Sequence, residues 1–145
     1  MDNLFSEDWA IVATIDPDAN TVATLQSDEI DMTDWEQLAV ITMAGTLGAS
    51  ASIVTTITDS ATTGGSFSAV SGKTTTIGGT SPTTGSDTQK IINFRSAEGN
   101  SNARYVKVSM QTTGATSDSA LLVLGKGRHR PASDNDLASV SEIVK

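Results

Sequence analysis

The chain has 145 residues, 37% of them hydrophobic and 4% aromatic, which fits one domain with one modest core. A formal net charge of −8 argues against general nucleic-acid binding, and the absence of cysteine excludes disulfides and thiolate metal sites. The acidic start lacks the apolar stretch of a secretory signal, and no apolar run approaches the roughly 18 residues of a membrane helix. We therefore expect a soluble protein that is made in the cytoplasm.

Charged residues are unevenly distributed along the chain. Residues 1–36 contain ten acidic residues and no lysine or arginine, whereas all nine lysines and arginines lie from Lys73 onward. Two interpretations remain open: ordinary solvation of the surface, or an acidic face and a basic face that guide docking or self-association.

The first strand is predicted at 10–15, after an N-terminal arm. The sequence DPDAN at 16–20 predicts a turn, because proline fixes φ and the Asp and Asn side chains bond to nearby backbone. Residues 21–26 are then predicted to return as a second strand. Further along, Trp35 is expected to close one end of a sandwich.

The strongest strand pattern of the first half is QLAVITMA at 37–44. Its continuous apolar run predicts a central strand that is buried on both faces. The β-branched stretch at 51–58 predicts the next strand, and short strands are predicted at 67–70 and 74–77. Residues 90–95 show the alternation of a half-buried strand.

The last two predicted strands flank a connection of small residues. Val106, Val108 and Met110 alternate with less apolar residues, the period-2 pattern of a half-buried strand. The Thr, Gly, Ser and Asp composition of 113–119 predicts a hairpin loop. The continuous apolar run at 120–124 is short enough to be a strand buried on both sides.

About eight strands follow one another at spacings of about 8–14 residues, which predicts an all-β fold, a jelly roll or β-sandwich of antiparallel strands. We expect the β-sandwich or jelly-roll domain at 9–126, with flexible arms at 1–8 and 127–145. Within the C-terminal arm, residues 134–144 could form a short helix, or could order only on a partner.

Motifs that imitate ligand sites fail in detail. The 16–20 sequence opens like a calcium loop, but Thr21 stands where that loop needs glycine and Ser27 where it needs glutamate. Gly72-Lys73-Thr74 resembles the end of a P-loop, but Phe67 occupies the position of the required earlier glycine. The sequence therefore predicts no metal and no cofactor.

No catalytic device is predicted either. His129 is the only histidine, it lies among cations, and no G-x-S-x-G elbow is present. We therefore expect a protein that is not an enzyme and has no small-molecule substrate.

The candidate interface residues are Trp9, Arg128, His129 and Arg130. Lys126, Arg128, His129 and Arg130 leave the last strand together. The two arginines could form bidentate pairs with carboxylates of a neighbouring subunit, or the cluster could be a solvated tail. Trp9 is either an end-of-barrel core residue or an interface anchor.

Several segments resemble small virion proteins of tailed bacteriophages. The S-D-x-(I/V)-D-M piece lies at 27–32, the apolar strand after it at 37–44, and a strand ending in T-D-S at 53–60. KIINFR follows at 90–95, the R-Y-V-K-V strand at 104–108 and a T-G turn at 113–114. The A-x-x-V-L-G strand with its basic exit before proline lies at 120–131. Together with the residues between them they cover about two thirds of the chain.

The resemblance implies a capsid cement (decoration) protein. Such a protein is a jelly roll or β-sandwich that binds the outer surface of the major capsid protein lattice and stabilises the head. It implies a homo-oligomer, dimer or trimer, on the capsid surface of a virion, made in the host cytoplasm, with no nucleic-acid or membrane partner. The alternatives are another virion accessory of the head–tail junction or tail, and a carbohydrate-binding module, for which Trp9, Trp35 and Tyr105 are widely scattered.

Overall fold

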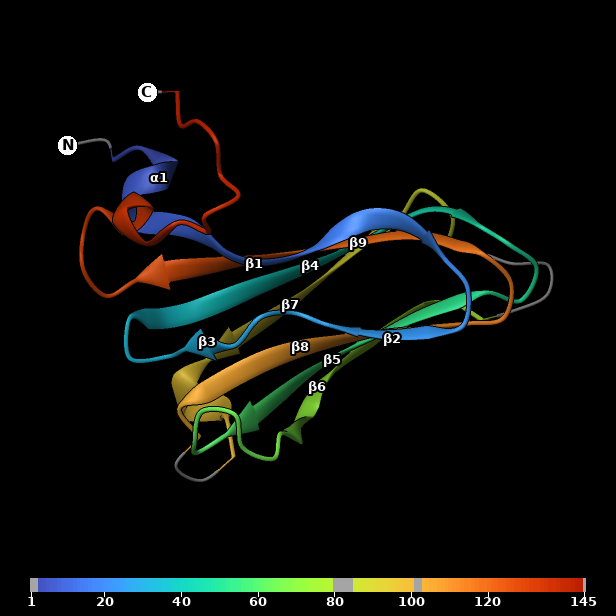
Figure 1. The fold of residues 1–145 in the computed structure, drawn as a ribbon, viewed down its shortest axis with the longest axis horizontal. Helices are drawn as coiled ribbons and strands as arrows, with labels where there is room; N and C mark the ends of the chain where they lie inside the picture. Colours follow the sequence, from blue (N-terminus) through green and yellow to red (C-terminus); the bar gives the residue numbers. More distant parts are fainter. Residues whose placement is uncertain (1–2, 80–84, 101–102, 145) are drawn as a thin grey trace.

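The computed structural model describes residues 3–79, 85–100 and 103–144 (Figure 1). In chain order the elements are α1 (Phe5–Asp8), β1 (Trp9–Asn20), β2 (Ala23–Gln26), β3 (Ile30–Asp31), β4 (Trp35–Leu47), β5 (Ser52–Ser60), β6 (Ser68–Gly78), β7 (Gln89–Arg95), the 3₁₀ turn η1 (Ser96–Glu98), β8 (Tyr105–Thr113), β9 (Ser117–Gly127) and the 3₁₀ turn η2 (Ala132–Asn135).

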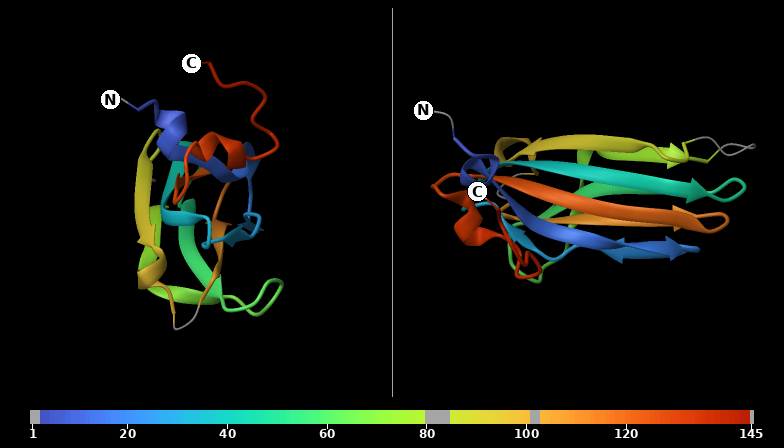
Figure 2. Two further views of the ribbon diagram at one scale, coloured as in Figure 1. Left: turned by 90° about the vertical axis from the view of Figure 1, so that its left-hand side faces the viewer. Right: turned by 90° about the horizontal axis from the view of Figure 1, so that it is seen from above.

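The strands form two antiparallel sheets that face each other (Figures 1 and 2). Sheet A has the order β1-β9-β4-β7, and sheet B has the order β2-β8-β5-β6, with the two-residue β3 also paired to β8. The predicted all-β fold is confirmed. Leaving β3 aside, the first strand pairs with the last, the second with the second-last, and so on inward, which is the order of a jelly roll.

The core lies between the sheets. From sheet A it takes Val40 and Val123, and from sheet B Ile53, Ile57 and Val108, all 0% exposed. Each strand can contribute because successive side chains point to opposite faces. The predicted alternation in β7 and β8 is confirmed by the same burial pattern.

A buried hydrogen bond and a buried tryptophan also lie in this interior. The hydroxyls of Thr42 on β4 and Thr55 on β5 are 2.7 Å apart and link the two sheets. Trp35 is 5% exposed, as expected for a residue that closes one end. Its indole lies on Gly125 of β9, where a Cβ atom would come within 2.6 Å of the ring.

The turn predicted at 16–20 is wrong, because β1 continues through these residues to Asn20. β1 pairs only with β9 and so is an edge strand, and its register shifts between Ile15 and Asp18. An edge strand with a bulge tolerates Pro17, which cannot donate a ladder hydrogen bond. The chain reverses instead at 21–22.

The short strands predicted at 67–70 and 74–77 are parts of one strand, β6. Its pairing with β5 is interrupted between the Thr56–Thr74 and Thr58–Ala69 pairs, where four residues of β6 oppose Ile57 alone. The predicted gap is therefore a bulge within the strand.

The hairpin predicted around 113–119 is also wrong. β8 belongs to sheet B and β9 to sheet A, so the short connection crosses between the sheets. Gly114 makes this possible, since it has φ of +82° and a Cβ atom there would lie 2.6 Å from the carbonyl oxygen of Ser50.

The strand at 37–44 is central, as predicted, and so is the strand at 120–124, but the burial on both faces that was predicted for both strands is wrong. Over Leu38–Ala44 of β4 and Leu121–Lys126 of β9, buried side chains alternate with half-buried ones. The buried side chains point into the core. The half-buried ones, such as Ile41 and Leu122, lie on the outer face of sheet A.

The arms lie at one end of the sandwich, called here the arm end: residues 3–9 and 127–144 (Figures 1 and 2). The opposite end, which holds the turns after β1 and β8, is called the loop end. The N-terminal arm contains the single turn α1, and β9 ends at Gly127. The short helix considered at 134–144 is not formed, because only η2 at Ala132–Asn135 is helical there.

A candidate protein interface at the arm end

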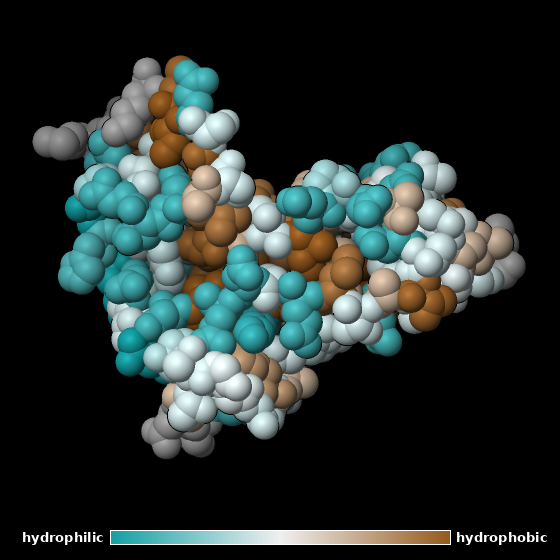
Figure 3. All heavy atoms as spheres, viewed as in Figure 1, coloured by the Kyte–Doolittle hydropathy of each residue, from teal (hydrophilic) through white to brown (hydrophobic). Residues whose placement is uncertain are grey.

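Exposed apolar side chains gather at the arm end. Among the described residues, six large hydrophobic side chains are exposed, and four of them lie on the two arms: Leu4 at 46%, Phe5 at 62%, Ile143 at 36% and Val144 at 85%. Figure 3 shows hydrophobic atoms at this end of the molecule. Exposed apolar groups of this kind mark a surface that another protein can cover.

Trp9 is held where the N-terminal arm joins the sandwich. It caps α1, begins β1 and pairs with Lys126 across the sheet. Its ring is stacked against Phe5, with centroids 6.3 Å apart and planes 5° from parallel. Trp9 is half-buried, so it combines packing with an accessible edge.

Arg130 joins the two arms. Its Nη2 lies 2.7 Å from Oδ1 of Asp8 at the end of α1. The arginine side chain is 59% exposed, which makes this a surface ion pair of small stabilising effect. One carboxylate partner of Arg130 thus lies within the chain, whereas the sequence left open a neighbouring subunit or a solvated tail.

Arg128 and His129 are the two residues before Arg130, and they do not take part in its ion pair with Asp8. The backbone N–H of Arg128 donates to the carbonyl of Asp34 at 3.0 Å, and Nη2 donates to Ser96 Oγ at 3.2 Å. His129 is exposed. The structure therefore brings Trp9 and Arg130 together through α1, whereas Arg128 faces η1.

The C-terminal arm is attached to the free edge of β1 at Ile11. The N–H of Ile11 donates to Asp136 Oδ1 at 2.7 Å, and its carbonyl accepts from the N–H of Leu137 at 2.6 Å. The arm then runs past Phe5 and Trp9. A cleft of about 210 Å³ lies between the arms, with Phe5, Trp9, Ile11, Val140 and Ile143 among its lining residues.

These features suit protein binding. An apolar cleft beside a stacked aromatic pair and exposed arginines has the composition of an interface centre. The sequence singled out the tryptophan and the basic cluster. It missed Leu4, Ile143 and Val144, whose only signal is that they are apolar residues within otherwise polar arms.

Ion pairs explain part of the uneven charge distribution. Within the described residues, four of the five ion pairs join an acid of residues 1–36 to a base further along: Asp8–Arg130, Glu29–Lys107, Asp31–Arg104 and Glu36–Lys126. Hydrogen bonds from Arg104 hold the pKa of the Asp31 carboxyl well below its usual range. Part of the acidic stretch is thereby neutralised within the chain.

The described residues give less support to a metal site, a sugar-binding platform or a membrane-spanning helix. Within the described ranges, no three histidine, aspartate or glutamate side chains are grouped as metal ligands. Trp35 is buried and so cannot belong to a sugar-stacking platform with Trp9 and Tyr105. No helix in the described part of the chain is long and apolar enough to span a membrane.

The chain was compared with protein-family models, with curated proteins and with solved structures, and none of these comparisons found a match. The resemblance to phage cement proteins therefore stays a prediction.

Proposed function

We propose that this chain is a structural virion protein, a capsid cement subunit that binds the outer surface of the major capsid protein lattice and stabilises the head. The single observation that carries the proposal is the arm end, where both arms present exposed apolar side chains beside a half-buried tryptophan and two exposed arginines. The resemblance of the virion-like segments supplies the identity of the partner.

A capsid cement protein acts through its contact area and its many copies. A cement subunit needs complementary contacts with neighbouring subunits and no chemical step. Each arm can contact a different lattice subunit, and two contacts by one molecule raise the overall affinity well above that of either. The rigid jelly roll keeps both arms at one end, so that they can bind one surface together.

The test uses the full chain and expanded empty capsids of its own phage. We expect the protein to co-sediment with the capsids and to raise their melting temperature. Failure of both would overturn the proposal. Binding at the head–tail junction or on the tail, seen by electron microscopy of labelled particles, would replace it with the role of a head–tail or tail accessory.

Variants locate the contact. The double variant F5S/V144S removes two exposed apolar side chains from the arms, and we expect it to bind capsids weakly. V22S is the matched control, because Val22 is 73% exposed but lies at the loop end. If F5S/V144S binds as well as V22S does, the arm end is not the capsid-binding surface.

A further inference from the structure

The middle of the outer face of sheet A is largely apolar. Figure 2, seen from above, shows the strands of sheet A lying open between the arm end and the loop end. The apolar face consists of the outward side chains of the middle of this sheet: Ile11, Ala39, Ile41, Met43, Ile91, Ala120, Leu122 and Leu124. Ile91 is 60% exposed.

The strand register arranges these residues in rows across the sheet. Ile41 of β4 pairs with Ile91 of β7 on one side and with Leu122 of β9 on the other, and this is the middle row. The rows on either side of it contain Ala39 with Leu124 and Met43 with Ala120. The middle row is therefore apolar across three strands, whereas the rows on either side are apolar on β4 and β9 and carry Asn93 and Gln89 on β7.

Charges border this face, with opposite signs at its two ends. Lys126 lies four residues after Leu122 on β9, and Asp118 lies four residues before it. On the β7 side, Arg95 lies four residues after Ile91, and the exposed Asp87 lies four residues before it. The arm end of the border therefore carries Arg95 and Lys126, the latter also paired with Glu36 at 3.2 Å, and the loop end carries Asp118.

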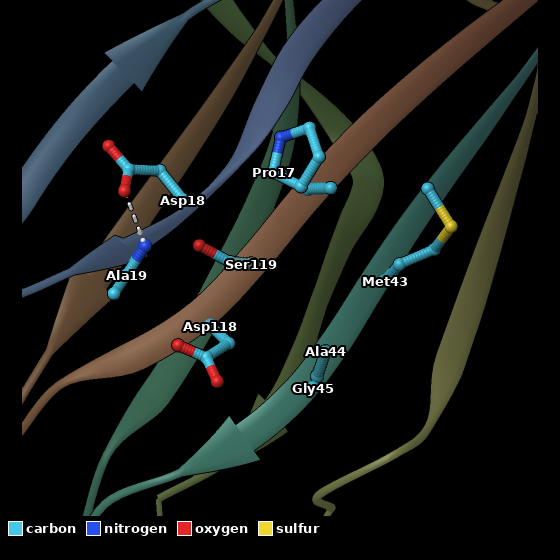
Figure 4. A pocket seen from close by; sticks show the side chains of 9 residues that line it. Pro17, Asp18, Ala19, Met43, Ala44, Gly45, Asp118 and Ser119 are labelled. Atoms are coloured by element: carbon cyan, nitrogen blue, oxygen red, sulfur yellow. Dashed lines mark hydrogen bonds between the residues drawn. The ribbon is translucent and has the colours of Figure 1, made fainter.

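Asp118 lines an open depression of about 590 Å³ on the same face. Figure 4 shows its lining, in which Met43 of β4 lies across from Asp118 of β9 and Pro17 of β1. Asp18 also lines it, with its Oδ1 accepting a hydrogen bond from the N–H of Ala19 at 2.7 Å. The loop end thus offers acidic groups around a partly apolar hollow.

We propose that two copies of the chain associate through the apolar faces of sheet A, about a twofold axis that runs across the strands at the middle row. This operation reverses the strand direction and places each strand over its own copy. Ile41, Ile91 and Leu122 then lie at the axis. Lys126 faces Asp118 of the second copy, because both residues lie on β9 at four residues from Leu122, in opposite directions.

Packing of this kind would supply the second buried face that the apolar runs of β4 and β9 predict. Two sheets that pack face to face lie about 10 Å apart with their strands roughly aligned, and their inner side chains interdigitate. The opposite charges at the ends favour this orientation over the one that places like ends together.

The dimensions predict a weak dimer. Five rows about 6.8 Å apart on four strands about 4.8 Å apart give a face of roughly 500 Å² per copy. Stable dimers bury about 800 Å² per partner, so this one should form at micromolar or higher concentration. The dimer does not depend on capsid binding, because it concerns the isolated protein and the middle of sheet A, where only Ile11 also lines the cleft between the arms.

Sedimentation velocity of the full chain tests the proposal over a concentration series from about 1 to several hundred micromolar. We expect a dimer that dissociates on dilution and on addition of salt. K126E and D118K should each raise the dissociation constant by at least about tenfold, and K126E/D118K should restore it, because the opposed charges are then exchanged. K107E is the control, since Lys107 is also paired with a glutamate but lies on sheet B.

A second variant tests the axis itself. I91E places two carboxylates opposite each other, and it should abolish the dimer without changing the melting temperature of the monomer, since Ile91 is 60% exposed. V22E, at a comparably exposed residue outside the face, should leave the dimer intact. A monomer at every concentration, an unaffected I91E, or a double variant that stays as weak as the single ones would each overturn the proposal.

Discussion

The outer faces of the two sheets belong to the same fold but differ in chemistry. In sheet B, the middle row across β2, β8, β5 and β6 is Gln26, Ser109, Thr56 and Thr74, all of them polar. In sheet A, the corresponding row is Thr14, Leu122, Ile41 and Ile91.

Sheet B has the clean alternation of an antiparallel sheet with one face in the core and one in solvent. Even its polar outer side chains bond to each other, as Thr56 does to Thr74 at 3.1 Å. A jelly roll of this size therefore does not need an apolar outer face to be stable. The apolar face of sheet A is better explained by a contact outside the monomer than by folding.

The largest predicted loss of stability should distinguish the inner face of sheet A from its outer face. Leu121 is 1% exposed and points into the core, whereas its neighbour Leu122 lies on the apolar face. L121A should lower the free energy of unfolding by about 2–5 kcal/mol, because it leaves a cavity in the core. L122A should lower it by less than about 1.5 kcal/mol in dilute, monomeric protein, measured by urea unfolding.

The protein concentration supplies the control for the variants L121A and L122A. Because a dimer stabilises the folded state by mass action, the cost of L122A should grow as the protein concentration rises, while that of L121A should not. Equal losses for both variants in dilute protein would mean that the outer face of sheet A is part of the folding core.

The next effect concerns the link between the sheets. T42V should destabilise the protein by roughly 1–3 kcal/mol, because it leaves the buried Thr55 hydroxyl without its 2.7 Å partner. T42V/T55V should recover most of that loss, since two apolar groups of the same shape then meet. A double variant that loses the sum of both single losses would show that the hydroxyls do not act on each other.

The sequence predicted local structure well wherever one face of a strand is polar. The alternation in 90–95 and in Val106, Val108 and Met110 gave the correct inward residues, because period-2 burial is a local property. The extension of β1 through Pro17 was not predictable, since it depends on β1 being an edge strand. The connection at 113–119 has the same composition whether it closes a hairpin or crosses between sheets.

The candidate site was predicted in part. Trp9 and Arg130 lie 121 positions apart in the sequence, and only the jelly-roll order, which pairs β1 with β9, brings them to one end. The partner of Arg130 is Asp8, one of ten acids in the first 36 residues, and the sequence offers no reason to choose it. The continuous apolar runs in 37–44 and 120–124 are a signal of the apolar face, although the same runs predict strands that are buried on both faces.

A smaller, pH-dependent effect is expected at the edge of sheet B, where β3 pairs with β8. Arg104 donates from Nε to Asp31 Oδ1 at 2.8 Å and also pairs with Oδ2, which lowers the pKa of Asp31. Since the unfolded carboxyl titrates near 3.9, the stabilisation is present at neutral pH and is lost as the pH falls below about 4 toward the folded pKa.

D31N should therefore be less stable than the wild type at pH 7, and the difference should shrink progressively between pH 5 and pH 2 in urea titrations. D28N is the control, because Asp28 is an exposed acid of the same segment. A difference that is independent of pH would assign the effect of D31N to the hydrogen bonds with Thr33 instead.

At the arm end we expect the smallest loss of stability, together with a larger loss of capsid binding. R130E replaces the 2.7 Å pair with Asp8 by two facing carboxylates, but the arginine is 59% exposed, so the loss of unfolding free energy should stay below about 1 kcal/mol. Capsid co-sedimentation should fall much more, because the arms are no longer held in one arrangement. Equal losses of stability and of binding would contradict an interface role for Arg130.

The exchange variant D8R/R130E separates two ways in which Arg130 can act. If the ion pair positions the arms, the exchanged pair restores their arrangement, and capsid binding should recover together with the stability. If the Arg130 guanidinium itself contacts a capsid carboxylate, stability should recover while binding stays weak. Recovery of neither would mean that Asp8 and Arg130 do not act as a pair, and the structural link between the two arms would then rest on the contacts of Ile11 with Asp136 and Leu137.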